Sequence, residues 1–415
     1  MEATRVRQRA RAIGETLAAF LALTKDAWTI LGAVILLMAV LESLLTFYYK
    51  KTDEEKFRKE VQSVADSGVY KNAPWTSDLL GELFHHHRTA LPWAPYTHTH
   101  GAMLEGKYVN GTESGTRKTW NSDAPITSAG RSLKISFFGG SNAWGFGSRD
   151  DFTIPSLVSK KLSGHGISAV VTNHAVSGDS TTQSLVRFIL EVREKGAPDL
   201  VVFYGGLIDA KLACRGERPG APLGNSYLDQ VISGKRPDAS ARTVASLFIR
   251  ENLALIRVSR DIGRHLRKTL SPGKDAESKG CKTKMDTLSD ETLDVYLKNA
   301  AFLSNLSSKL AFGSLIYLEP QRADKAARTV HEENRLLELE NAVPGVVDLY
   351  SLTREKLADR QRQGTERNRI HDLRTIFANV SGVLFIDDQH YGEEANEIVS
   401  TMIAADVEAL YSPAR

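Results

Sequence analysis

The residues of this chain that are most able to do chemistry are one serine and an Asp-x-x-His sequence far from it. Ser141 lies in Gly-Gly-Ser-Asn-Ala-Trp-Gly (139–145), directly after an apolar run, and Asp387 and His390 follow another apolar run near the C-terminus. A histidine that is oriented by a carboxylate can accept the proton of a serine hydroxyl, so these residues predict nucleophilic catalysis. Each pattern alone is common, because the first can be an ordinary glycine-rich turn and the second a surface acidic turn.

Two other segments place a glycine after an apolar run. Gly178 follows the run that ends near Asn173, and Gly206 and Asp209 lie in Tyr-Gly-Gly-Leu-Ile-Asp-Ala after a third run. Glycine lets the backbone approach a ligand closely, and a backbone N–H can hydrogen-bond to an oxyanion. A glycine after a strand is routine, so neither segment is specific alone.

From residue 133 onward, strand and helix patterns alternate. The strand-like runs are 134–138, 168–173, 199–205, 313–320 and 382–388, and the helical patterns are 152–162, 181–195, 240–270, 290–311, 322–341 and 392–411. The run 199–205 is almost continuously apolar, as in strands of a parallel sheet that is covered on both faces. The alternation predicts a three-layer α/β/α sandwich with a mostly parallel, doubly wound sheet. The carboxyl ends of its strands would bring the four segments above to one edge.

In this order, the segments resemble the SGNH (GDSL-type) hydrolases, an α/β/α family of esterases, lipases and carbohydrate deacylases. The resemblance covers about residues 133–411, and its most specific parts are 139–162 and 385–399. Residues 93–119 are similar to the segment that precedes the nucleophile in membrane-anchored bacterial members. The resemblance implies an ester hydrolase without a metal or organic cofactor.

The resemblance also assigns roles to residues. Ser141 would be the nucleophile, His390 the general base and acid, and Asp387 the group that orients it. The oxyanion hole would include Ser141, Gly178 and Gly206. The substrate would be an acyl ester, which in anchored members could be an O-acyl group on an envelope polysaccharide.

Two positions depart from the family pattern. Ile208 stands where Gly-x-Asn-Asp has an asparagine that donates to the oxyanion, and Ala395 replaces a glycine after the histidine. Losing one such donor typically costs about 10²–10³ in rate. Asn142 is a candidate substitute donor. Two other functions therefore stay open: O-acyl transfer to a glycan acceptor, and a catalytically impaired binding or scaffold protein of an envelope complex.

Composition excludes several other classes of protein. The chain has 415 residues with 53 Lys+Arg against 50 Asp+Glu, a formal net charge of +3, and 42% hydrophobic residues. A wholly disordered chain would need low hydrophobicity and a strong net charge. A nucleic-acid binder would need a basic excess, so no nucleic-acid partner is expected. Two cysteines exclude a disulfide-dense scaffold and a Cys₄ zinc site.

Residues 27–49 form a long apolar run whose one charged residue is Glu42. At about 1.5 Å per residue, a helix of this length measures about 35 Å, enough to cross a hydrocarbon core of about 30 Å. A buried core helix and a cleaved signal peptide are the alternatives. The run predicts one transmembrane helix between a basic segment, 1–26, and a charged stalk, 50–70. Basic residues flank it equally, so they do not decide the orientation.

The rest of the chain divides into an irregular leader, 71–130, that packs on the domain, and the hydrolase domain, 131–415, with an insert at about 211–290. The insert contains Cys214 and Cys281, which could form a disulfide in an oxidising compartment or be unrelated thiols. The family setting places the domain on the periplasmic side of a bacterial inner membrane. A metal site is not expected, because consecutive histidines do not converge easily on one ion; those considered were His85, His86, His87, His98 and His100.

Overall fold

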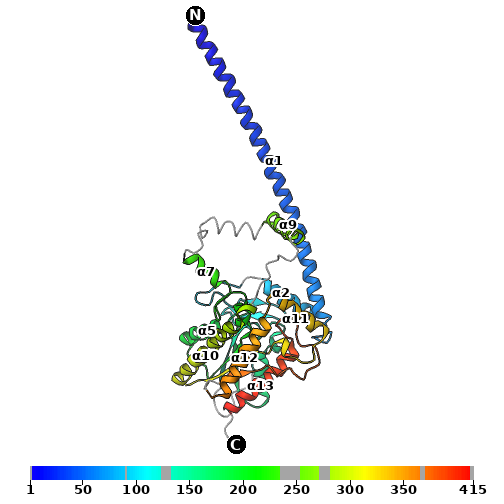
Figure 1. Cartoon of the computed structure of the whole chain (residues 1–415), viewed down its shortest axis with the longest axis vertical. Coiled ribbons are helices and arrows are strands. Elements are labelled where there is room, and N and C mark those ends of the chain that lie inside the picture. The colour runs from blue at the N-terminus through cyan, green and yellow to red at the C-terminus, as the bar shows by residue number, and fades with distance from the viewer. Residues whose placement is uncertain are drawn as a thin grey trace. The chain divides into compact units, whose positions relative to one another are not determined.

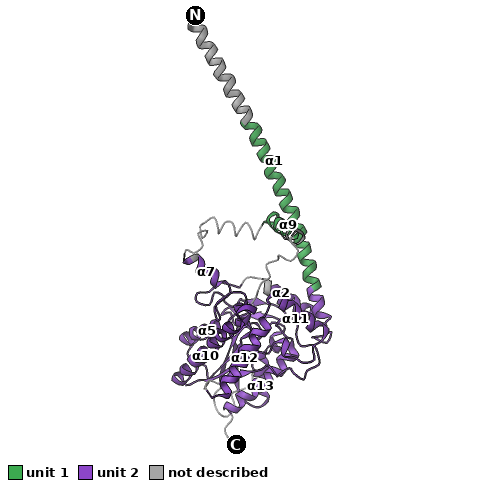
Figure 2. Ribbon diagram, in the orientation of Figure 1, with its two compact units in different colours: residues 1–59, 236–275 green, residues 60–235, 276–415 purple. Residues whose placement is uncertain are grey.

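A computed structural model describes residues 2–88, 91–122, 132–233, 253–270, 281–364 and 370–411 (Figure 1). The chain divides into two compact units. One contains residues 1–59 and 236–275, and the other contains residues 60–235 and 276–415 (Figure 2).

The larger unit is built on a five-stranded sheet in which all neighbouring strands are parallel. The strand order is β4-β3-β5-β6-β7, with β3 (Leu133–Gly139), β4 (Ala169–Asn173), β5 (Leu200–Gly205), β6 (Gly313–Leu318) and β7 (Ile370–Asp372). The order reverses between β3 and β5, and ligands of such sheets bind beyond the strand ends at that point. The prediction of a doubly wound α/β sheet is therefore confirmed.

Helices cover both faces of the sheet. They are α3 (Ser141–Trp144), α4 (Ile154–Gly164), α5 (Thr181–Lys195), α6 (Leu207–Cys214), α10 (Met285–Leu310), α11 (Val330–Ala342), α12 (Val346–Arg362) and α13 (Glu393–Tyr411). In β6, Ile316 packs against α5 and α10, whereas the hydroxyl of the next residue, Tyr317, donates to Asp406 of α13 at 2.7 Å. Since successive strand residues point to opposite faces, α13 lies on the face opposite α5 and α10. This arrangement gives the three layers that the sequence predicts.

The leader is more regular than its sequence predicts. It contains α2 (Thr76–Arg88) and a small antiparallel pair, β1 (Leu104–Glu105) and β2 (Asn110–Gly111). The N–H of Arg117 donates to the carbonyl of Asn173 at the end of β4, at 3.0 Å. The leader is thus hydrogen-bonded to the edge of the sheet.

The prediction of a last strand at 382–388 is wrong, and the fifth strand is β7 instead. Leu384, Phe385 and Ile386 are fully buried, but no strand of the described residues pairs with them. The N–H groups of Leu384 and Phe385 donate to the Glu332 carboxylate at 3.0 and 3.4 Å. The N–H of Ile386 donates to the carbonyl of His390 at 2.9 Å. A side chain and a local turn therefore satisfy the backbone that a neighbouring strand would otherwise pair.

The region of the predicted insert contains more helix than expected. α6 begins directly after β5 and runs to Cys214, and α7 (Asn225–Ile232) follows it. Of the helix predicted at 240–270, the described part is α9 (Ala254–Leu270), which belongs to the smaller unit. Residues 234–252 and 271–280 lie outside the described part. The helix α12 was not predicted from the sequence.

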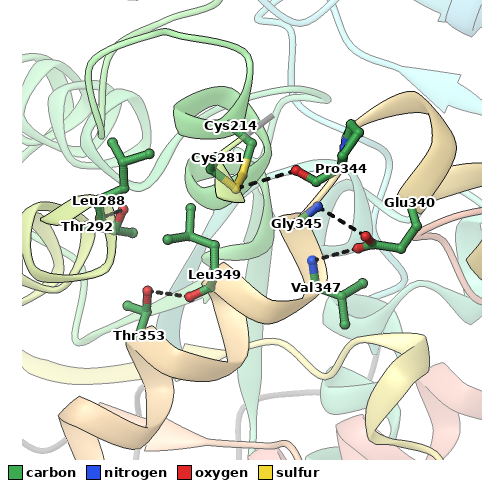
Figure 3. The surroundings of a disulfide bond; sticks show 10 residues. All are labelled: Cys214, Cys281, Leu288, Thr292, Glu340, Pro344, Gly345, Val347, Leu349 and Thr353. Carbon is green, nitrogen blue, oxygen red and sulfur yellow. Dashed lines mark hydrogen bonds between the residues drawn. A yellow bond between two sulfur atoms is a disulfide. The ribbon is translucent and has the colours of Figure 1, made fainter. Parts of the chain in front are cut away.

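Cys214 and Cys281 form a disulfide in the structure (Figure 3). Both are buried in a cluster with Leu339, Leu349 and other residues of α11 and α12, and the N–H of Cys281 donates to the carbonyl of Pro344 at 3.2 Å. The bond connects the end of α6 to the residues before α10, which are 67 positions apart in the sequence.

We expect that replacing both cysteines by serine destabilises the larger unit. Removing a native disulfide typically costs about 2–5 kcal/mol. The measurement is thermal unfolding of the purified full chain with and without dithiothreitol. Reductant should lower the melting temperature of the native chain to that of the double variant and leave the variant unchanged. Equal melting temperatures of the oxidised native chain and the variant would contradict a stabilising bond.

The smaller unit contains most of α1 (Glu2–Ala65) together with α9. Within the described residues, α1 is the one helix that is long and apolar enough to cross a membrane. The apolar run predicted to span the membrane, 27–49, lies inside it, and the helix continues without a break through most of the predicted stalk.

Candidate active site

The nucleophile segment leaves the sheet at the carboxyl end of β3. A Cβ on Gly139 would lie 2.0 Å from the carbonyl oxygen of Tyr204 on β5, so this close approach requires a glycine. The chain then turns, the N–H of Trp144 donates to the carbonyl of Gly140 at 2.9 Å, and Ser141 becomes the first residue of α3. Its hydroxyl is therefore held at the edge of the sheet where β3 and β5 end.

Ser141, His390 and Asp387 form a continuous hydrogen-bonded chain. The Oγ of Ser141 lies 2.7 Å from Nε2 of His390, and Nδ1 of His390 lies 2.6 Å from Oδ2 of Asp387. Because an ionised carboxylate accepts only, Nδ1 carries the proton, which leaves Nε2 to accept the serine proton. This is the arrangement that a serine nucleophile with a histidine base requires.

The second carboxylate oxygen of Asp387 holds the turn itself. Its Oδ1 accepts the backbone N–H groups of Gln389 at 2.9 Å and of His390 at 2.8 Å. Burial alone would raise the pKa of Asp387, but the charge and hydrogen bond of His390, with these N–H groups, hold that pKa well below its usual range. Asp387 therefore remains ionised at neutral pH. The imidazole itself is buried, and the ring of Phe146 packs on it with centroids 4.2 Å apart.

The three segments predicted to supply oxyanion N–H groups meet beside the nucleophile. A Cβ on Gly140 would lie 3.4 Å from the carbonyl oxygen of Asp179, and one on Gly205 would lie 3.9 Å from the nitrogen of Gly140. Gly178 has a φ of +86° in the turn after β4, and Gly206 has a φ of +120° directly before α6. The turns that carry Ser141, Gly178 and Gly206 are thus neighbours, and their role as oxyanion donors stays a prediction.

Asn142, the candidate substitute donor, is bound to a buried carboxylate. Its Nδ2 donates to Oε2 of Glu319 at 2.6 Å and to the carbonyl of Gln389 at 3.3 Å, which uses both amide hydrogens. Glu319 follows β6, and its Oε1 accepts the N–H of Leu207 at 3.2 Å. Burial raises the pKa of Glu319, against the effect of these hydrogen bonds. Glu319 thus connects the segments that follow β3, β5 and β6. Asn142 would have to break its hydrogen bond to Glu319 before it could donate to an oxyanion.

The sequence does not predict two residues near the base: Gln389, which contacts His390, and Lys211, which contacts Gln389. Nε2 of Gln389 lies 3.0 Å from Nε2 of His390, the nitrogen that Ser141 also contacts. The ammonium of Lys211 donates to Oε1 of Gln389 at 3.0 Å and to Oδ2 of Asp388 at 2.7 Å. The available signal is that Lys211 lies one helical turn after Leu207, but the sequence predicts an insert that begins at about residue 211.

Two residues of the leader pack against α3, the helix that begins with Ser141. Nε of Arg117 donates to Oδ1 of Asp150 at 2.8 Å, and its guanidinium lies 4.3 Å from the ring centre of Trp144. His86 is buried and stacks on the same ring, with centroids 4.8 Å apart. At least one of the histidines considered for a metal thus has a packing role against α3. The side chain of His87 lies outside the described part.

No family model and no curated protein matches the chain. Among solved structures, it is similar to the acetyl xylan esterase AlAXEase, with 16% identity over 66% of this chain and 100% of that chain and a TM-score of 0.35. It is also similar to a carbohydrate acetylesterase family member from Sinorhizobium meliloti, with 14% identity over 68% and 100% and a TM-score of 0.36. A protein assigned to the lipolytic G-D-S-L family from Desulfitobacterium hafniense DCB-2 has 11% identity over 66% and 98% and a TM-score of 0.34.

These three similar structures are an acetyl xylan esterase, a carbohydrate acetylesterase family member and a protein assigned to a lipolytic family. At such identities and scores, the likeness assigns no residue of this chain. The fold rests on the five parallel strands themselves, and the site rests on its own hydrogen bonds.

Proposed function

We propose that this chain is a membrane-anchored serine esterase that hydrolyses O-acyl esters. The observation that carries the proposal is the hydrogen-bonded chain from Ser141 through His390 to Asp387, with distances of 2.7 and 2.6 Å, at the carboxyl edge of a parallel sheet. The hydroxyl, imidazole and carboxylate stand in the order that acyl transfer to a serine needs.

In the proposed reaction, Oγ of Ser141 attacks the ester carbonyl while Nε2 of His390 takes its proton. The same imidazole then donates that proton to the leaving alcohol, which leaves an acyl group on Ser141. Water activated by His390 hydrolyses this acyl-enzyme and releases the acid. The N–H groups of Ser141, Gly178 and Gly206 would stabilise the tetrahedral oxyanions.

Gln389 is our proposal for the side-chain donor that this chain lacks at Ile208, where the family pattern has an asparagine. Its amide nitrogen lies 3.0 Å from the imidazole nitrogen that Ser141 contacts, and Lys211 holds its oxygen. An ammonium on the amide oxygen polarises the amide, which makes its N–H a stronger donor. A small rotation of this side chain away from His390 would direct the N–H toward the reacting carbonyl.

We expect Gln389→Ala to lower kcat/KM for p-nitrophenyl acetate by about 10²–10³, the usual cost of one oxyanion donor. If Gln389 only competed with Ser141 for the imidazole, the same variant would be faster than the native chain. The control is Gln363→Ala, at an exposed residue at the C-terminal end of α12, which should leave the rate unchanged. An unchanged or increased rate in Gln389→Ala would contradict the donor role.

The cell compartment in which the domain lies limits the substrates that it can meet. The apolar segment of α1 would span the inner membrane of a bacterium, and the disulfide between Cys214 and Cys281 is typical of an oxidising compartment. We therefore place the domain on the periplasmic side. A tethered esterase there meets the envelope polysaccharides, so we propose O-acyl groups on such a polymer as its substrate.

A fluorophosphonate probe tests nucleophile and base together. The purified full chain should be labelled on Ser141, and His390→Ala should abolish labelling because the hydroxyl loses its base. Ser308→Ala, at an exposed serine of α10, is the control and should label like the native chain. Labelling at another serine, or equal labelling of His390→Ala, would overturn the proposed site.

A further inference from the structure

The helix α9 (Ala254–Leu270) is strongly two-sided. Apolar residues follow one another at helical spacing on one side, at Leu255, Val258, Ile262 and Leu266. The sequence of α9 also has five arginine and lysine residues and one aspartate, and these fall between the apolar positions. Ile262 and Leu266 are 54% and 50% exposed. An apolar stripe of this kind normally packs on a core or enters a membrane surface.

The first turn of α9 binds the one charged residue of the apolar run in α1. The carboxylate of Glu42 accepts the backbone N–H of Ala254 at 2.5 Å and that of Leu255 at 3.0 Å. The N–H groups at a helix start have no partner within the helix, and an acidic group there is stabilising. Glu42, which is costly in a membrane segment, thus has a defined partner in the same unit.

The later contacts between the two helices are also polar. The guanidinium of Arg257 donates to both carboxylate oxygens of Asp53 at 2.7 and 2.8 Å, and the hydroxyl of Tyr49 donates to Asp261 at 2.9 Å. Along α9, the partners on α1 are therefore residue 42, then 53, then 49. Since the order is not monotonic, α9 crosses α1 and does not run alongside it.

This crossing lies where the apolar run of α1 ends. The run ends at Tyr49, and Lys50 and Lys51 follow it. α1 contacts the polar side of α9 through Arg257 and Asp261, whereas Ile262 and Leu266 on the apolar side remain exposed. In water this arrangement would leave apolar surface uncovered; at the boundary of a bilayer it is the favourable one.

We propose that α9 is an interfacial helix that lies in the surface of an anionic membrane beside α1, with its apolar stripe among the acyl chains and its basic residues at the headgroups. This inference rests on the proposed anchoring by α1. An amphipathic helix with basic residues gains both from buried apolar area and from attraction to anionic lipid. Because α9 belongs to the chain between α7 and α10, a second segment of the proposed enzyme would then be held at the membrane.

An environment-sensitive fluorophore measures the depth of α9. The native cysteines are paired, so a single cysteine introduced into the full chain can be labelled with nitrobenzoxadiazole. The protein is reconstituted in vesicles of phosphatidylcholine with or without phosphatidylglycerol. The stripe is probed by Ile262→Cys, the opposite side by Arg260→Cys, and the larger unit by Ser308→Cys. Carbonate extraction reports separately whether α1 anchors the chain.

We expect blue-shifted emission and quenching by bilayer spin labels at position 262, weaker effects at 260 and none at 308. Phosphatidylglycerol should increase the effect at 262. Aqueous emission at 262 in a chain that resists carbonate, or equal signals at 262 and 260, would overturn the interfacial helix alone. A signal at 262 without dependence on phosphatidylglycerol would overturn the headgroup contacts. Extraction of the whole chain would overturn the anchoring, and this inference with it.

Discussion

Replacing Ser141 by alanine is expected to remove the esterase activity, with a fall in kcat of at least about 10⁴-fold, because knocking out a triad serine costs up to about 10⁶. The Oγ of this residue lies 2.7 Å from Nε2 of His390, and alanine leaves the base without a nucleophile. The residue is partly exposed, so the change should leave the stability of the fold nearly unchanged. The measurement is p-nitrophenyl acetate hydrolysis by the purified full chain, with thermal unfolding of the same preparation.

Ser308→Ala provides the matched control, since that serine is exposed and its hydroxyl donates to the carbonyl of Ser304 within α10. The control should retain native kinetics. If Ser141→Ala kept more than a tenth of the native rate, the hydrolysis would come from another residue. Activity absent from both the native chain and the variant would instead favour the binding or scaffold function.

The contact between nucleophile and base was predictable although 249 residues separate them. Both follow apolar segments, and the sequence predicts both segments as strands of a parallel sheet, whose carboxyl ends gather at one edge. The Asp387–His390 pair is local, so its spacing alone was informative. The sequence could thus identify which side chains meet without any knowledge of the distances between them.

The segment that carries the base was predicted in the wrong conformation. Leu384, Phe385 and Ile386 look like a buried strand, because full burial selects apolar residues in a strand and in a loop alike. What separates the two cases is the backbone partner, here the Glu332 carboxylate 52 positions away. A single sequence contains no local sign of that contact. His390 nevertheless lies 2.7 Å from Ser141, because the turn that Asp387 holds after this loop lies at the same edge of the sheet.

Gln389 and Lys211 show a second limit of the sequence. Their contact depends on α6 being a helix that directs Lys211 toward the loop 178 residues later. The polar stretch after Cys214 makes the region from residue 211 onward resemble a loop. The residues up to Cys214 instead form α6, which follows β5. The bond between Glu42 and the start of α9 is similar, since 212 positions separate Glu42 from Ala254. An apolar run predicts the first of these two helices and a helical pattern predicts the second, but polar groups decide how they meet.

Asp387→Asn should lower kcat by about 10⁴ while the chain remains folded. The Oδ1 of asparagine can still accept the N–H groups of Gln389 and His390, so the turn is retained. The amide nitrogen would replace the carboxylate oxygen at 2.6 Å from Nδ1 and donate to it. The imidazole proton then moves to Nε2, which can no longer accept the proton of Ser141.

Asp388→Asn is the matched control, because the neighbouring carboxylate binds Lys211 and not the imidazole. Its kcat should stay within a few-fold of the native value. The pKa of Asp387 is held well below its usual range by the imidazole and the backbone N–H groups, so Asp387 stays ionised as the pH falls toward 5. Equal rates for the two variants would show that Asp387 holds the loop without orienting the base.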